Sequence, residues 1–157
     1  MQVEKSMQQY YALRAKEYDQ VYAKPERQKD LRNLQILLPK LLTDRKLIEI
    51  ACGTGYWTQF IADETTSIDA VDASQEVLEI ARSRIDNPSV KFHTANAYAL
   101  PESLGTFEAA FSGFWISHIL KSRLRPFLKN LHARLAPNSK VIFLDNLYVE
   151  GSSTPVS

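Results

Sequence analysis

The chain has 157 residues, of which 45% are hydrophobic and 24% are charged, and its formal net charge is +1. This composition predicts one globular domain over residues 1–150, followed by a loop-like tail over residues 151–157. The near-neutral charge does not indicate a nucleic-acid partner, and no apolar run approaches the ~18 residues that a membrane span needs. A single cysteine, Cys52, excludes an internal disulfide and points to a reducing, cytoplasmic setting.

A helix is expected over about residues 7–22. Within it Tyr10, Arg14 and Tyr18 recur every four residues and therefore share one face. These side chains form either a packed aromatic stripe or part of a lid that touches a ligand. The residue types alone leave both interpretations open.

A second helix is expected to begin near Pro25 and to kink or end at Pro39. Its apolar face is formed by four leucines. They are Leu31, Leu34, Leu38 and Leu41.

The most informative stretch begins with the apolar run over residues 47–50, which predicts a buried parallel strand. A turn of small residues containing Gly53 and Gly55 follows, and a helix is expected from about Tyr56 to Ala62. A strand, a glycine turn and a helix in this order are typical of a nucleotide-binding unit, because glycine lets a ligand approach the main chain closely. An ordinary tight turn is the alternative.

A second strand is predicted over about residues 67–71, ending at Asp72. Asp72 lies 19 positions after Gly53, close to the ~20-residue offset at which an acidic residue binds ribose hydroxyls in dinucleotide-binding folds. The alternative is a helix cap, because a helix plainly begins at Ser74. That helix is expected to end at Asn87-Pro88.

Two further strands, over about residues 90–93 and 107–111, each end in residues suited to a ligand site. Asn96 follows the first, where open parallel sheets bind ligands, although it could instead stabilise a turn. Gly113 follows the second and permits close approach. Phe114 and Trp115 offer flat apolar surface for a substrate.

The next helix is expected to be capped by Ser122, to end at Pro137-Asn138 and to be followed by a fifth strand over residues 140–145. Its core face follows the helical period. That face consists of Leu124, Phe127, Leu128, Leu131 and Leu135.

The alternation of strands and amphipathic helices predicts an α/β fold. We expect an open, mostly parallel, doubly wound (Rossmann-like) sheet of about five strands, with helices on both faces and two N-terminal helices. The ligand crevice is expected over Gly53, Asp72, Asn96 and Gly113, at the carboxyl ends of the strands.

Taken in order, these segments resemble class I S-adenosylmethionine-dependent methyltransferases of the small-molecule type. The resemblance covers nearly the whole chain and rests on residues 49–55, 71–74, 96–101 and 113–115, together with an N-terminal segment, residues 10–19, that is similar to the cofactor lid of many members. It implies S-adenosyl-L-methionine as cofactor and a small-molecule methyl acceptor.

Carried over, the resemblance implies contacts of Gly53 and Gly55 with the methionine and sugar part of the cofactor, of Asp72 with the ribose, and of Asn96 with adenine. Phe114 and Trp115 are expected in the substrate pocket. The full expected cofactor set is Tyr10, Arg14, Tyr18, Ala51, Gly53, Gly55, Trp57, Asp72, Ala73, Asn96, Ala97, Tyr98 and Gly113. Two positions depart from the family pattern: Ala51 replaces a glycine, and Asn96 replaces the usual aspartate.

The largest departure is that the family sheet has seven strands, whereas this chain stops soon after its fifth. We therefore expect a fragment or a truncated form. The fifth strand would be an exposed edge, open to pairing with a second copy in a homodimer.

His118 is the best candidate for a general base, should the acceptor lose a proton; a surface histidine is the plainer interpretation. Cys52 is expected to fill the turn rather than act as a nucleophile. The histidines and Cys52 show no metal-ligand spacing, so no metal is expected.

Two other functions compete with methyl transfer. One is an NAD-dependent oxidoreductase, which fits poorly because Thr58 occupies the third glycine position of that motif. The other is a truncated, non-catalytic module that binds the cofactor or oligomerises.

Overall fold

The computed structural model describes residues 2–146, with side chains described from residue 7 onward. Five strands form one sheet, and every neighbouring pair is parallel. The strands are β1 (Lys46–Ile50), β2 (Ser67–Asp72), β3 (Val90–Thr94), β4 (Phe107–Gly113) and β5 (Leu135–Leu144). Their order across the sheet, β3-β2-β1-β4-β5, confirms the predicted doubly wound α/β fold.

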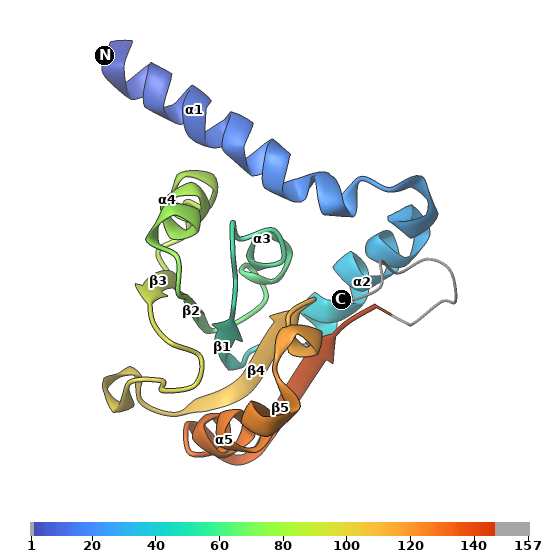
Figure 1. Cartoon of the computed structure of the whole chain (residues 1–157), viewed down its shortest axis with the longest axis vertical. Coiled ribbons are helices and arrows are strands. Elements are labelled where there is room, and N and C mark those ends of the chain that lie inside the picture. Colours follow the sequence, from blue (N-terminus) through green and yellow to red (C-terminus); the bar gives the residue numbers. More distant parts are fainter. Residues whose placement is uncertain (1, 147–157) are drawn as a thin grey trace.

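Helices cover both faces of this sheet, as Figure 1 shows. The helices and 3-10 turns are α1 (Gln2–Asp19), η1 (Gln20–Tyr22), η2 (Pro25–Arg27), α2 (Gln28–Leu41), α3 (Thr58–Ile61), α4 (Gln75–Arg84), η3 (Glu102–Leu104), η4 (Ile116–His118) and α5 (Lys121–His132). Side chains of α2, α3 and α4 share a core with one face, and those of α5 pack on the other. No helix of the described part is long and apolar enough to cross a membrane.

The alternation of side chains along β1 explains how one strand supports two cores. Leu47 belongs to the core under α2 and α3, whereas Ile48 and Ile50 belong to the core under α5. Because successive side chains point to opposite faces, Glu49 lies on the same face as Leu47. After Lys46, the strand is therefore apolar on both sides except for one acid placed beside the glycine turn.

The order of the strands reverses between β1 and β4. Strands β2 and β3 extend from β1 in one direction, and β5 extends from β4 in the other. In open parallel sheets this point leaves a crevice outside the carboxyl ends of the two central strands. The glycine turn follows β1, and Gly113 ends β4, so both border this crevice.

Two predicted boundaries were wrong near the glycine turn and at α5. The helix after the turn begins at Thr58 rather than Tyr56, because the turn itself continues through Trp57. Helix α5 begins at Lys121 with Leu120 in the capping position, so Ser122 is not the cap.

The end of α5 also differs from the prediction. The helix stops at His132, and Leu135 already belongs to β5, where it packs in the same core that a helical Leu135 would reach. Pro137 and Asn138, expected to end the helix, instead lie inside β5. Asn138 has a φ of 61°, and the register against β4 shifts between Phe107 and Ala109. Such a bulge accommodates a proline that cannot donate to the ladder.

Candidate functional site

The glycine turn combines three backbone positions in the left-handed region. Ala51, Gly53 and Gly55 have φ values of 55°, 55° and 78°. A side chain at Gly55 would collide with Ile85 of the segment that ends α4, at 2.8 Å, whereas a side chain at Gly53 would meet nothing within 4 Å. Gly55 therefore lets α4 pack against the turn, and Gly53 leaves open space beside the main chain.

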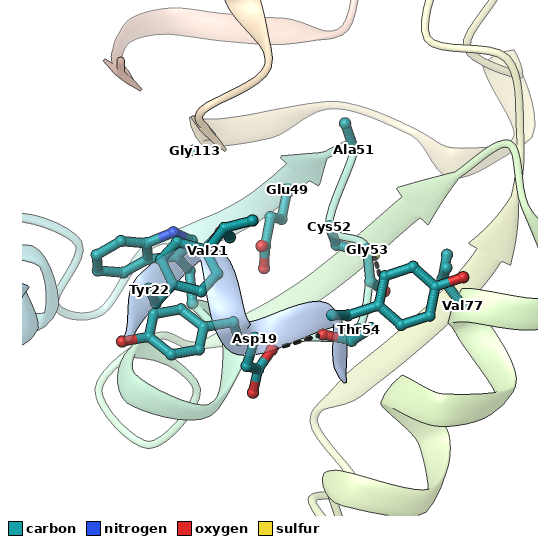
Figure 2. A pocket seen from close by; sticks show the side chains of 13 residues that line it. Asp19, Val21, Tyr22, Glu49, Ala51, Cys52, Gly53, Thr54, Val77 and Gly113 are labelled. Atoms are coloured by element: carbon teal, nitrogen blue, oxygen red, sulfur yellow. Dashed lines mark hydrogen bonds between the residues drawn. The ribbon is translucent and has the colours of Figure 1, made fainter. Parts of the chain in front are cut away.

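A first cavity of about 150 Å³ lies between this turn and the end of the N-terminal segment. Figure 2 shows Glu49 projecting into it from β1, with Tyr22 on one side and Cys52 and Gly53 on the other. Its wall is completed by Trp57, which is 3% exposed.

Glu49 is the buried acid of the first cavity. It is 2% exposed, and the Thr58 hydroxyl donates a hydrogen bond of 2.5 Å to its Oε1. Burial raises the pKa of Glu49 to about 8, with the nearby charge of Asp72 acting in the same direction. At neutral pH the carboxyl is therefore largely protonated, and a cationic ligand group placed beside it would favour its ionisation.

A second, larger cavity of about 770 Å³ adjoins the first. The two share three residues in their walls: Tyr18, Ala51 and Gly113. The remaining wall contains half of the residues that the sequence indicated. They are Asp72, Ala73, Asn96, Ala97, Tyr98, Phe114, Trp115 and His118, and the unpredicted Val71 and Ala95 also line it.

Asp72 connects β2 to the glycine turn. Its Oδ2 accepts a hydrogen bond from the Gly53 N–H at 2.9 Å, and its Oδ1 accepts one from the Ser74 N–H at 2.9 Å. Ser74 caps α4 itself, since its hydroxyl accepts from the Val77 N–H. Asp72 thus orders the turn while it lines the second cavity, and its ligand role stays a prediction.

Asn96 adopts the turn geometry that was its alternative interpretation. Its Oδ1 accepts from the Tyr98 N–H at 2.9 Å, which fixes the side chain at the rim of the second cavity. The Arg123 guanidinium lies 3.8 Å from the centre of the Tyr98 ring. The loop after β3 is therefore ordered by contacts of its own.

The ring of Trp57 leaves no room for a side chain at residue 113, so glycine is needed there. A side chain at this position would approach the Trp57 ring to 2.8 Å. Trp57 stacks at 6.1 Å on Phe114, whose φ is 59°. The Trp57 Nε1 is buried and has no hydrogen-bond partner in the described part of the chain.

The predicted lid residues divide into two groups. Tyr18 lines both cavities, whereas Tyr10 and Arg14 line neither. Arg14 instead pairs with Glu17 and Glu76, each at 2.7 Å. The structure therefore brings only the end of α1 to the site.

Several lining residues were not among the predicted set. Asp19 accepts a hydrogen bond from the Thr54 hydroxyl at 3.2 Å and forms an ion pair with Arg84. Glu49 and Tyr22 were also missed. Asp19 and Glu49 both lie inside segments on which the family resemblance rests. Their place in those segments is the sequence signal that could have identified them as site residues.

His118 and Cys52 differ sharply in accessibility. His118 is exposed on η4 and lines the second cavity, so a solute can reach its imidazole. Cys52 is buried and free, and burial raises the pKa of its thiol well above the usual value. A thiol held protonated in this way is a poor nucleophile.

The joined cavities fit a dinucleotide-like or nucleoside ligand with a cationic group. Gly53 offers an open approach to the main chain, and the Trp57 Nε1 is an unused buried donor. Asp72 lies beside the second cavity, and Glu49 lies in the first. An acid at each of two connected cavities matches a ligand with hydroxyls at one point and positive charge at another.

Comparison with known proteins agrees with this description. Residues 47–138 match the family described as "Methyltransferase domain". The demethylmenaquinone methyltransferase of Lactococcus lactis subsp. lactis is 26% identical over 110 residues, which cover 66% of this chain and 43% of that protein. The malonyl-[acyl-carrier protein] O-methyltransferase of Acetivibrio thermocellus is 35% identical over 94 residues, which cover 56% of this chain and 31% of that protein.

Solved structures give the same result. The DhpI-SAH complex superposes with a TM-score of 0.72 and 27% identity, covering 90% of this chain and 68% of that one. DesVI of Streptomyces venezuelae superposes with a TM-score of 0.71 at 22% identity, covering 89% of this chain and 60% of that one, which shows a shared fold.

The doubly wound sheet, with acids and glycines at the carboxyl ends of β1 and β2, defines a protein of the Rossmann-like nucleoside-binding class. Within this class, the chain belongs to the methyltransferase-domain family, whose match covers more than half of its residues. The chain spans less than half the length of the curated relatives it matches.

Proposed function

We propose that the chain binds S-adenosyl-L-methionine across the joined cavities and transfers its methyl group to a small-molecule acceptor. The observation that carries the proposal is the connection of the two cavities, with Glu49 and Trp57 in one and Asp72 and Asn96 in the other. The family match supports the same activity. The relatives named as small-molecule methyltransferases support the acceptor class.

In this proposal the polar residues bind and orient the cofactor. Asp72 accepts hydrogen bonds from ribose hydroxyls while it keeps the Gly53 N–H in place. Asn96 presents its amide to the adenine. Glu49, ionised by the approach of the cofactor's ammonium group, supplies the opposite charge in the first cavity.

The aromatic residues enclose the reacting centre. Tyr18, Phe114 and Trp115 line the second cavity and exclude water from it. The bound cofactor supplies an electrophilic methyl group, whose bond to sulfur breaks as the bond to the acceptor forms. His118, exposed at the same cavity, accepts a proton where the acceptor atom must lose one.

Calorimetric titration with S-adenosylmethionine, S-adenosylhomocysteine and NAD tests the proposal. We expect the two sulfur ligands to bind and NAD not to bind. Asp72→Ala should weaken binding roughly ten- to hundredfold, since it removes a charged hydrogen-bonding group worth about 1.5–3 kcal/mol. Asp86→Ala, which removes an exposed acid in the same region, is the matched control.

A folded protein that binds none of these ligands would contradict the proposal and favour the non-catalytic module. Preferential binding of NAD would favour the oxidoreductase. Asp72 also organises the glycine turn, so thermal melting of each variant must accompany the titrations.

Two properties of the whole molecule belong to the same proposal. We infer a homodimer formed through the outer edge of β5, because β5 is the last strand of the sheet and pairs only with β4 among the described residues. We also retain the cytoplasmic location expected from the single cysteine, whose thiol is free and buried.

A further inference from the structure

A third cavity, of about 260 Å³, opens beside the two that hold the proposed cofactor. It lies between residues 21–27 of the N-terminal segment and the loop after β4. It shares Tyr22 with the first cavity and both Phe114 and His118 with the second. A molecule in the third cavity would therefore contact the same aromatic wall that faces the cofactor site.

Apart from Tyr22, the ionisable residues that line the third cavity are all basic. They are Lys24, Arg27 and His118, which we call the basic mouth, and no acid lines this cavity among the described residues. None of the three forms an ion pair with a described acid. The only side-chain hydrogen bond of the Arg27 guanidinium in this part of the chain is a 3.4 Å contact to the Val21 carbonyl.

The other arginines near the site behave differently. Arg14 pairs with two glutamates, and Arg84 pairs with Asp19. The Arg14–Glu76 and Asp19–Arg84 pairs join the N-terminal segment to α4 and have a structural purpose. Lys24 and Arg27 form no ion pair among the described residues, so their charge is available to a ligand.

One acid of the adjoining cavity, Asp145, is already engaged. Asp145 accepts hydrogen bonds from the backbone N–H groups of Ser117, at 2.8 Å, and Asn146, at 2.8 Å. It lines a neighbouring cavity of about 400 Å³, together with Asp30 and apolar side chains. The apolar residues of this neighbouring cavity are Leu31, Leu34, Phe114 and Leu144.

The two cavities share Arg27, Phe114 and Asn146 and therefore form one crevice. The part of the crevice lined by Lys24 and Arg27 carries positive charge, and the other part carries apolar surface together with the acids Asp30 and Asp145. Crevices of this kind bind ligands whose apolar body fills the pocket while a few polar contacts fix the orientation.

We propose that the methyl acceptor, within the function proposed above, is a small molecule carrying an oxyanion, either a carboxylate or a phosphate-type group. Lys24 and Arg27 bind the oxyanion, and Phe114 with Leu31 and Leu34 holds the apolar body. Arg27 is the main determinant, because a guanidinium binds two oxygens of such a group at once.

Titration with three aromatic probes tests this inference. The probes are 4-hydroxybenzoate, phenyl phosphate and methyl 4-hydroxybenzoate, and each is titrated in the presence and absence of S-adenosylhomocysteine. We expect at least one anionic probe to bind tenfold or more tightly than the neutral ester, and this difference to shrink as salt is raised. The choice between the two anions identifies which oxyanion the crevice prefers.

Substitution of the basic mouth should remove the preference. Arg27→Gln and Lys24→Gln should each weaken the anionic probe by about tenfold and leave the neutral ester unchanged. Arg32→Gln, which removes an exposed arginine of α2 outside the cavity, is the matched control. Lys24 is exposed, so its substitution guards against misfolding of the Arg27 variant.

Absent or equal binding of the anionic and neutral probes overturns the inference, as does a preference that survives in the Lys24→Gln/Arg27→Gln protein. Binding of S-adenosylhomocysteine is measured separately from binding of the anionic probes. If S-adenosylhomocysteine fails to bind while the anion preference persists, the proposed function fails and the oxyanion site stands. The reverse pattern retains the methyltransferase and removes the anionic acceptor.

Discussion

At the scale of single residues, Ala51 carries measurable backbone strain. Its φ of 55° lies in the left-handed region, which costs an L-residue roughly 1–2 kcal/mol. Ala51→Gly should relieve this strain in the folded state. Glycine also raises the entropy of the unfolded chain, which offsets part of the gain, so the free energy of unfolding should rise by about 0.5–1 kcal/mol. Chemical denaturation measures the change.

Ala73→Gly is the control for Ala51, because Ala73 is a loop alanine of the same cavity region whose φ is not positive. It should destabilise the protein by roughly 0.5–1 kcal/mol. If Ala51→Gly and Ala73→Gly changed the free energy of unfolding in the same direction, that result would contradict the strain assigned to Ala51.

Glu49 should make stability depend on pH. Burial raises the pKa of its carboxyl to about 8, well above the value in an unfolded chain, so the folded state holds a proton that the unfolded state has lost. The free energy of unfolding should therefore fall as pH rises from about 4.5 to 8, by up to a few kcal/mol, since each unit of pKa difference is about 1.4 kcal/mol.

Glu49→Gln keeps an oxygen acceptor for the Thr58 hydroxyl and cannot ionise. This variant should flatten the fall in stability between pH 4.5 and 8 when denaturation is followed across that range. Glu64→Gln, an exposed acid, should leave the profile of the native protein intact. A profile unchanged by Glu49→Gln would show that Glu49 does not hold the proton.

The sequence predicted the residues whose spacing is fixed along the chain. Gly53 and Asp72 belong to one unit of β1, glycine turn, α3 and β2, and the Asp72 carboxylate accepts a hydrogen bond from the Gly53 N–H. It did not predict that Glu49 and Trp57 would line the same cavity, because their exposure depends on how Tyr22 of a distant segment covers them. The spacing of the glycines along the chain also does not indicate that Gly55 allows α4 to pack against the turn.

At the scale of elements, side chains from Tyr11 to Asp19 link α1 to α4, and the most buried ion pair lies at the end of α1. Much of the helix is exposed, and Figure 1 shows it extending away from the sheet. The Asp19–Arg84 ion pair is the more buried of its links to α4, with side-chain exposures of 23% and 16%. The Arg14–Glu76 pair is more exposed, with 31% and 53%.

Asp19→Asn should therefore release the end of α1. It weakens the pair with Arg84, a charged hydrogen bond worth about 1.5–3 kcal/mol, while it keeps an acceptor for Thr54. Hydrogen exchange should speed up over residues 14–22. Glu76→Gln breaks a pair worth less than about 1 kcal/mol and should change exchange little. Equal effects would show that α1 is not held at Asp19.

The wrong boundary between α5 and β5 has a physical origin. Leu135 continues the helical apolar pattern of Phe127 and Leu131, and it also fits the strand face that packs on the same core. Periodicity cannot distinguish these placements where a helix leads directly into a bulged strand. The opening of α4, by contrast, was predicted because Ser74 is a local cap.

At the scale of the whole molecule, the alternation of strands and helices predicted the layers of the sheet. The crevice with the basic mouth could not be predicted. It joins Lys24 and Arg27 to His118, about ninety positions away, and this distance is closed only when the N-terminal segment packs across the end of β4. Nothing in the local sequence of either segment indicates the other.

The outer edge of β5 should govern association of the molecule. Val141 of β5 is 43% exposed, and Leu128 and Leu124 of α5 are 41% and 38% exposed. Among the described residues β5 pairs only with β4, and such an edge is a template for a second copy, whose own β5 would extend the sheet across a two-fold axis. Val141→Lys should place charge in this contact and shift the protein to monomer, as measured by light scattering during size-exclusion chromatography.

Leu13→Lys, on the far helix α1, makes the same exchange at a side chain that is 62% exposed and should leave the dimer intact. Association that weakens equally in both variants would indicate non-specific apolar contact. A native protein that stays monomeric at high concentration would remove the β5 dimer altogether. Leu144, the last residue of β5, and Asp145, which follows it, line the crevice, so loss of the dimer with unchanged binding of the anionic probes would show that each chain completes its own acceptor site.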